Sequence, residues 1–324
     1  MNLVTYRSRA PRIGVMDGDA IWDLRDVYAW YLFETERGHD SEALAEQLVP
    51  NEMGLFIRLN HGRLDTYADA IARAKKAGLD YARHNAASTR LLAPILAPNK
   101  IICCGSSYRE YLEGFPIPRE DWPQDVKISF LKPPTALIGH GETIPCPPDA
   151  KLLDYENEMA IIIGRTCSDV SESDAGKYIF GYSILNDSCV RDIPKWTGGG
   201  DAPRGKACDG FAPMGPCIVP APYLQGNPND LGFTTHVDGE LRQNSRTSKL
   251  MFTVEHVVAF ISRYIRLLPG DIISTGSTLG NGHLLNKHLK QGQTVRLEIE
   301  GIGVLENKVG QKTWTSTIMP IAAD

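Results

Sequence analysis

The sequence lacks three features that mark specialised classes of protein: a long hydrophobic run, an excess of basic residues and paired cysteines. No stretch approaches the roughly 20 consecutive apolar residues of a membrane-spanning helix, so we expect no membrane partner. The opening segment MNLVTYRSRAPRIGV has no basic stretch followed by an apolar one, so we expect no signal peptide either. The net charge of −5 gives no electrostatic reason to expect a nucleic-acid partner.

Cysteine occurs seven times but never in the CxxC spacing of a zinc or redox site. An odd number of cysteines without such spacing is typical of reduced, mostly buried thiols rather than of a disulfide framework. We therefore predict a cytoplasmic protein with free thiols. Hydrophobic residues make up 42% of the chain and charged residues 23%, which is ordinary for a soluble globular protein with a large core.

The length of 324 residues allows about two domains, and the character of the sequence changes near residue 95. Residues 1–24 are predicted to form short strands, with Asp17-Gly18 as the turn of a hairpin. Residues 40–90 are rich in alanine, leucine, arginine and lysine, which favours helices. Residues 91–99 contain two prolines and are typical of a linker.

After this linker the chain consists mainly of short β-rich runs separated by glycine and proline. One amphipathic helix interrupts them, with Thr253 as its N-cap and Pro269-Gly270 as its stop. We therefore predict an α+β fold that is mostly β. It would have a small α/β N-terminal domain over residues 1–95 and a larger domain over residues 96–324.

The stretch LLDYENEMAIIIGR places three alternating acids, Asp154, Glu156 and Glu158, directly before five apolar residues. In a strand the three carboxylates would share one face, and the apolar run would be covered on both sides. Carboxylates beside a low-dielectric interior must be paired, protonated or bound to a cation. The alternative is an exposed strand end whose acids meet water or basic neighbours.

A further acid, Asp187, follows the apolar strand Tyr182–Leu185. Together with Glu156 and Glu158 it would supply three oxygen ligands from two strands, leaving the other positions of a hard cation to water and substrate. Mg²⁺, Mn²⁺ and Ca²⁺ all take oxygen ligands, so the sequence does not choose among them. A simple turn aspartate is the alternative interpretation of Asp187.

Three other segments carry candidate polar groups. Lys206 follows the flexible stretch TGGG, and Lys132 precedes two prolines in a stiff, extended segment. The segment STGSTLGNG, residues 274–282, offers hydroxyls and backbone amides that could hold a carboxylate or simply form a turn. For Lys206 the alternative is a solvated loop lysine.

In this order the segments resemble the fumarylacetoacetate hydrolase family over nearly the whole chain. The matching stretches are LVTYR with RIGVMDGDAIWDL, FLKPPTALIGHG, DYENEMAIIIG, NDSCVRD, GKACDGFAPMGPCIV and the long segment from VDGELRQNSR to STGSTLGNG. The resemblance implies a mixed β-sandwich or β-roll catalytic domain, commonly in a homodimer. It also implies substrates that are small 2-oxo acids with a further carbonyl or enol group.

The resemblance further implies roles for individual residues. Mg²⁺, Mn²⁺ or Ca²⁺ would be bound by Glu156, Glu158 and Asp187, and Lys206 would be the catalytic lysine. The substrate-binding residues would be Tyr108, Arg191, Gly276 and Ser277, where Ser277 replaces the threonine that is usual in the family.

One segment departs from the family pattern. Hydrolytic members carry Asn-Tyr-x-x-His-x-x-Glu, in which the histidine and glutamate activate water, whereas SSYREYLEGF has Tyr111 and Gly114 at those positions. Glu113 or Glu110 would then have to act as the base. Three hypotheses follow: first, hydrolytic C–C cleavage of an acylpyruvate; second, a decarboxylase, tautomerase or isomerase without activated water; third, a non-catalytic metal-dependent binding protein.

Overall fold

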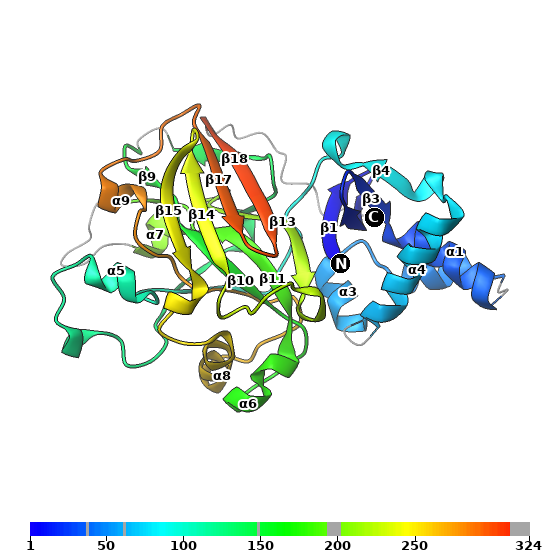
Figure 1. The fold of residues 1–324 in the computed structure, drawn as a ribbon, viewed down its shortest axis with the longest axis horizontal. Coiled ribbons are helices and arrows are strands. Elements are labelled where there is room, and N and C mark those ends of the chain that lie inside the picture. The colour runs from blue at the N-terminus through cyan, green and yellow to red at the C-terminus, as the bar shows by residue number, and fades with distance from the viewer. Residues whose placement is uncertain (37–38, 61–62, 148–149, 193–201, 312–324) are drawn as a thin grey trace.

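The structure is a computed structural model, in which we describe residues 1–36, 39–60, 63–147, 150–192 and 202–311. Its α+β fold has a small N-terminal α/β part and a larger β-rich domain, as predicted (Figure 1). The N-terminal part consists of β1 (Asn2–Arg7), β2 (Pro11–Asp17), β3 (Ala20–Asp23), α1 (Leu24–Glu36), α2 (Ser41–Leu48), α3 (Met53–Asn60), α4 (Leu64–Ala77) and β4 (Arg83–Asn85).

The predicted hairpin is confirmed, because β2 and β3 pair antiparallel with Asp17 opposite Ala20. Gly18 in the turn has a φ of +58°, a left-handed conformation that glycine adopts without steric cost. Helix α1 was not predicted, since its aromatic residues have modest helix propensity. Burial of Leu24, Val27 and Tyr28 in the core stabilises α1 despite this modest propensity.

An 11-stranded sheet runs through both parts of the molecule, in the order β4-β3-β2-β1-β13-β11-β10-β16-β5-β6, with β7 beside β13. Its remaining strands are β5 (Ile101–Cys104), β6 (Ile128–Lys132), β7 (Leu137–Ile138), β10 (Asn157–Ile163), β11 (Ile179–Asn186), β13 (Ala212–Pro220) and β16 (Ile272–Ser274). The two parts join where β1 pairs with β13, with Leu3 opposite Ile218. The segment predicted as a linker is largely buried from Leu91 to Ile95, so it packs into the fold.

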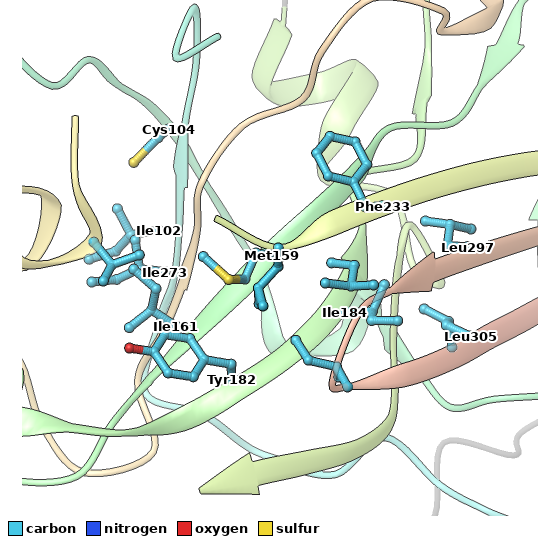
Figure 2. Packing of buried hydrophobic residues seen from close by; sticks show 14 of the residues in the cluster. Ile102, Cys104, Met159, Ile161, Tyr182, Ile184, Phe233, Ile273, Leu297 and Leu305 are labelled. Atoms are coloured by element: carbon cyan, nitrogen blue, oxygen red, sulfur yellow. The ribbon is translucent and has the colours of Figure 1, made fainter. Parts of the chain in front are cut away.

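Strand β10 lies between two hydrophobic cores, as its unbroken apolar run predicts. Met159 and Ile161 point into the core shown in Figure 2, under a second sheet. Ala160 and Ile162 point into the other core, which the N-terminal helices complete. The second sheet has the order β15-β14-β17-β18-β8 and consists of β8 (Thr143–Cys146), β14 (Gly232–Val237), β15 (Glu240–Arg246), β17 (Thr294–Ile299) and β18 (Gly303–Gln311).

The acidic stretch before β10 is not one continuous strand, contrary to the prediction. Asp154 ends the short strand β9 (Leu153–Asp154), which pairs with β12 (Cys189–Val190), and the chain leaves the strand conformation at Tyr155 and Glu156. The interruption separates Asp154 from the other two acids. It also breaks the period of two on which the prediction of a shared face rested.

The predicted amphipathic helix is α8 (Val254–Tyr264), and the Thr253 hydroxyl caps it by accepting a hydrogen bond from the His256 amide at 3.2 Å. It ends at Tyr264, before the proline-glycine stop. The other helices of the β-rich domain are α5 (Arg109–Glu113), α6 (Glu172–Ala175), α7 (Ala202–Lys206) and α9 (Gly282–Leu285). All seven cysteines are unpaired, as predicted. Within the described ranges, no helix has the length and hydrophobicity that a membrane crossing requires.

Candidate metal centre

Three buried carboxylates meet where β10 and β11 pair. Glu156 immediately precedes β10, Glu158 lies on it, and Asp187 immediately follows β11. One carboxylate oxygen from each residue lies within 4.8 Å of the others, and no side chain is more than 10% exposed. The Asp187 amide donates to the Glu156 carbonyl at 2.9 Å, which closes the end of the ladder and brings the acids together.

Each carboxylate is held by donors from other segments. Oε2 of Glu158 accepts hydrogen bonds from the Ser274 hydroxyl at 2.5 Å and the Gly276 amide at 2.8 Å. Oε1 of Glu156 accepts from Nη2 of Arg191 at 2.5 Å and Nδ2 of Asn281 at 3.3 Å.

The third carboxylate, that of Asp187, lies between two lysines. Nζ of Lys132 is 2.8 Å from Oδ1 of Asp187, in an ion pair that lacks hydrogen-bond geometry. Nζ of Lys206 donates to Oδ2 of Asp187 at 2.7 Å and also to Oε2 of Glu156. Lys206 is only 6% exposed, which excludes the solvated loop lysine. The Phe130 ring lies beside both ammonium groups, with its centroid 5.6 Å from Nζ of Lys206.

The charges of the cluster perturb the acidities of its members. Burial, and then the charges of Asp187 and Glu156, raise the pKa of Glu158 well above its ordinary value. Burial alone would raise the pKa of Glu156, but Lys206 and Arg191 lower it to about 2. Burial would lower the pKa of Lys206, yet the neighbouring carboxylates raise it well above its ordinary value. Buried carboxylates repel one another, and a bound divalent cation would relieve that repulsion.

The donor set fits a hard divalent cation. All three candidate ligands are carboxylate oxygens, without sulfur or imidazole nitrogen, and such ligands suit Mg²⁺, Mn²⁺ and Ca²⁺. Glu156, Glu158 and Asp187 thus form a divalent metal site. Asp154 does not belong to it, because its carboxylate binds Nε of Arg191 at 2.9 Å and the backbone amide of His283 at 3.1 Å.

The predicted substrate-binding residues surround this cluster, but their polar groups contact the protein itself. Arg191 bridges Asp154 and Glu156, and the Gly276 amide donates to Glu158. The Ser277 hydroxyl donates to the carbonyl of Asn157 at 3.3 Å. Tyr108 is 1% exposed and packs edge-on against Phe233, 5.8 Å between ring centroids. Their contacts with substrate remain predictions.

The segment that departs from the family pattern forms α5 and the turn after it. Glu110 accepts hydrogen bonds from Ser245 at 2.6 Å and Thr278 at 2.9 Å, and it pairs with Lys249. The side chain of Glu113 is 53% exposed and lies 3.5 Å from Arg119. The role of either glutamate as a base remains a prediction, and these contacts do not favour it.

Tyr111 of this segment is partly buried against the hydrophobic core, and its ring centroid lies 5.0 Å from that of Phe115. Burial, and then the negative charge of Glu156, raise its pKa, so its phenol keeps the proton at neutral pH. At Gly114 an added Cβ would lie 2.6 Å from Cδ2 of Leu279, so leucine fills the space beside the position of the family glutamate.

Sequence reasoning named Lys132 only as a candidate polar group, and it singled out neither Ser274 nor Asn281 as a partner of the acids. A lysine that ends an apolar strand, as Lys132 does in ISFLK, is the one local signal that pointed to a buried role. Ser274 and Asn281 lie in the segment 274–282, which was expected either to hold a carboxylate or simply to form a turn. Nothing local indicated that they would contact the acids near residue 157 instead.

Comparison with known proteins places this site in a family. The family described as "Fumarylacetoacetate (FAA) hydrolase C-terminal" matches residues 100–310, and the chain therefore belongs to the fumarylacetoacetate hydrolase family. A mitochondrial oxaloacetate tautomerase, fahd2, from Xenopus laevis is 31% identical over 95% of this chain and 90% of its own.

Two solved structures resemble the chain over nearly its full length. Maleylpyruvate hydrolase from Sphingobium sp. SYK-6, in complex with Mn²⁺ and pyruvate, is 29% identical with a TM-score of 0.71, over 97% of this chain and 100% of that chain. A 5-carboxymethyl-2-hydroxymuconate delta-isomerase from Mycobacterium smegmatis is 31% identical with a TM-score of 0.68, over 96% and 100%. The family and the carboxylate site together make the protein a metal-dependent enzyme.

Proposed function

We propose that the protein interconverts the keto and enol forms of a 2-oxo acid that carries a second carboxyl or carbonyl group, oxaloacetate being the simplest example. Similarity to an oxaloacetate tautomerase and to an isomerase supports this reaction class. The observation that carries the proposal is the composition of α5. Glu110 is hydrogen-bonded to Ser245 and Thr278, Glu113 lies beside Arg119, and Tyr111 stands where the family has its histidine.

Tautomerisation requires less of the protein than hydrolysis does. One proton leaves C3, another reaches the 2-oxo oxygen, and no water has to be activated. Glu156, Glu158 and Asp187 would hold a cation, which stabilises negative charge on the 2-oxo oxygen when bound. Lys206 places a fixed ammonium beside the same position, so it would favour the enolate over the keto form. In the enol-to-keto direction, the enol hydroxyl would release its proton to solvent and the protonated Tyr111 would donate a proton to C3, which it regains from solvent.

Hydrolytic C–C cleavage, the first of the three sequence hypotheses, is the second candidate function. The resemblance to a maleylpyruvate hydrolase over almost the whole chain favours it. This reaction needs a base for water, so Glu113 would have to leave Arg119 and turn toward the cluster. The tautomerase proposal needs no such rearrangement.

An assay of both reactions on one preparation tests the choice. We expect enzyme with saturating Mg²⁺ to convert enol-oxaloacetate to the keto form faster than it cleaves a simple acylpyruvate. The Glu110→Gln and Glu113→Gln variants separate the mechanisms, because neither side chain is needed as a base for tautomerisation. Rapid acylpyruvate hydrolysis that Glu113→Gln abolishes would establish the hydrolase instead. Absence of both activities would leave the non-catalytic hypothesis.

A further inference from the structure

Helix α5 carries Tyr111, the proposed proton donor, on a very short element. Burial, and then the negative charge of Glu156, raise the pKa of Tyr111, so its phenol lies within electrostatic range of that carboxylate. The helix is five residues long, and an isolated helix of that length is not stable in water, so tertiary contacts must fix its position. One such contact is the burial of Leu112, and another is made by the side chain of Glu110.

The carboxylate of Glu110 joins α5 to two other segments. Its Oε2 accepts hydrogen bonds from the hydroxyl of Ser245 on β15 at 2.6 Å and from the hydroxyl of Thr278 at 2.9 Å. Its other oxygen, Oε1, pairs with Nζ of Lys249. Burial would raise the pKa of Glu110, but the hydrogen bonds from Lys249, Ser245 and Thr278 lower it below its ordinary value. The side chain is therefore ionised at neutral pH, which strengthens each of these hydrogen bonds.

Thr278 belongs to a turn that also contacts the metal centre. Two residues before Thr278, the Gly276 amide donates to Oε2 of Glu158 at 2.8 Å. Between them, the Ser277 hydroxyl accepts a hydrogen bond from Nε2 of Gln243 at 3.0 Å. The turn is thus fixed to β10 and to β15 by contacts that do not involve α5. The hydrogen bond from Thr278 attaches the short helix to this fixed turn.

We infer that Glu110 is a positioning residue, which fixes α5 against the turn Gly276–Thr278 and so holds Tyr111 in place for proton transfer. The inference rests on the proposed function, in which Tyr111 donates the proton. The attachment matters because displacing a catalytic group by about 1 Å can lower a rate by about 10²-fold. Glu110 would thus support catalysis through Tyr111 rather than as the base that hydrolysis requires.

The test compares Glu110→Ala, which removes all three hydrogen bonds, with Glu110→Gln, whose amide oxygen can still accept from Ser245 and Thr278. In Glu110→Ala the amides of Leu112 and Gly114, which are hydrogen-bonded within α5, should exchange with solvent at least about tenfold faster. One hydrogen bond to a charged group typically contributes that factor, and alanine itself favours a helix, so propensity cannot explain faster exchange.

The same two variants are assayed with enol-oxaloacetate. We expect kcat of Glu110→Ala to fall by about 10–100-fold, whereas KM and Mn²⁺ affinity should change little because the turn keeps its other contacts. Glu110→Gln should recover most of kcat and the slow exchange. Arg109→Ala is the matched control, since Arg109 is an exposed charged residue on the same helix, and it should leave both quantities unchanged.

Thr278→Val isolates the contact with the turn, because it removes the hydroxyl and keeps the shape of the side chain. It should reproduce part of both effects, even if Glu110→Ala does not fold. The double variant should be no slower than Glu110→Ala alone, since both changes remove the same interaction.

Slow α5 exchange in both Glu110→Ala and Thr278→Val would overturn the inference. A kcat that falls equally in Glu110→Gln and Glu110→Ala, with slow exchange in the former, would also overturn it and would indicate direct participation of the carboxylate. The exchange measurement requires no activity. If the unaltered protein does not interconvert enol- and keto-oxaloacetate, the proposed function fails, while exchange still decides whether Glu110 fixes α5.

Discussion

Glu156 has two functions at the scale of the single residue, because one of its oxygens binds Arg191 while the other faces Lys206 and the cation site. Glu156→Gln removes one of three negative charges from the ligand set. We expect it to weaken Mn²⁺ binding by at least about 100-fold, beyond the usual effect of changing a neighbouring residue. Calorimetry checks this, with Glu298→Gln, a half-buried acid paired with Arg296, as the control. Undiminished Mn²⁺ affinity would remove Glu156 from the ligand set.

Lys206 contacts two of the candidate ligands, yet it is a cation and cannot itself bind the metal. In Lys206→Met we expect Mn²⁺ affinity to be retained or increased, because a competing positive charge is lost. Turnover should fall by about 10²–10³-fold, the usual cost of removing one group that stabilises an oxyanion. Affinity and kcat are measured on the same variant. Full activity in Lys206→Met would show that the lysine only neutralises the acids.

At the scale of the element, we propose that α5 determines which reaction the site supports. Tyr111→His with Gly114→Glu restores the family pair, and we expect hydrolysis of acylpyruvate to rise selectively, toward the 10²–10⁴-fold that acid–base groups typically contribute. The backbone at position 114 accepts any residue, since its φ is −72°. Leu279 occupies the space, so Leu279→Ala should be included. No gain in the triple variant, with its metal affinity intact, would mean that α5 does not control water activation.

A histidine joins α8 to the loop that follows α5. His256 contacts Asp125 at 2.8 Å and Glu172 at 3.0 Å, and it stacks on Phe252. Burial alone would lower the pKa of His256, but the two carboxylates raise it above its ordinary value of 6.5. Its stabilising contribution is therefore complete below pH 6.5 and is lost as pH rises through the folded-state pKa.

Because this site is partly exposed, solvent screening limits the contribution to about 0.5 kcal/mol. Unfolding free energies between pH 6 and 9 should show this decline, and His256→Gln should remove it. Arg263 also acts on Asp125, so Arg263→Gln serves as the control that leaves the histidine in place. An identical pH dependence in His256→Gln would assign the effect to another group.

At the scale of the whole molecule, the N-terminal part and the β-rich domain share one sheet and one core. Strand β1 extends the sheet through β13, and Ala160 and Ile162 of β10 pack in the same core as the N-terminal helices. We therefore expect one cooperative unfolding transition, monitored by calorimetry and by circular dichroism. Two separated transitions would support residues 1–95 as an independent domain. The predicted homodimer is a separate question, which light scattering answers.

The sequence by itself determined the parts of this protein that depend on local pattern. The apolar run from Met159 to Ile163 predicted a strand covered on both sides, and Thr253 predicted the start of a helix. Both predictions depend on side-chain alternation and capping, which act over a few residues. The acids Glu156, Glu158 and Asp187 were identifiable because each lies at the end of such a strand. The same local rule failed at Asp154, where the strand is interrupted and the side chain turns to Arg191.

Only the tertiary structure decided how those acids are held. Lys132 reaches the segment after β11 from 56 residues away, and Ser274 and Asn281 reach Glu158 and Glu156 across 116 and 125 residues. Pairings at such separations depend on the order of strands in the sheet, which no local pattern encodes. The identity of the acids could therefore be predicted from the sequence. The contacts that hold each carboxylate come from the fold, because buried polar groups must find partners wherever the chain brings them together.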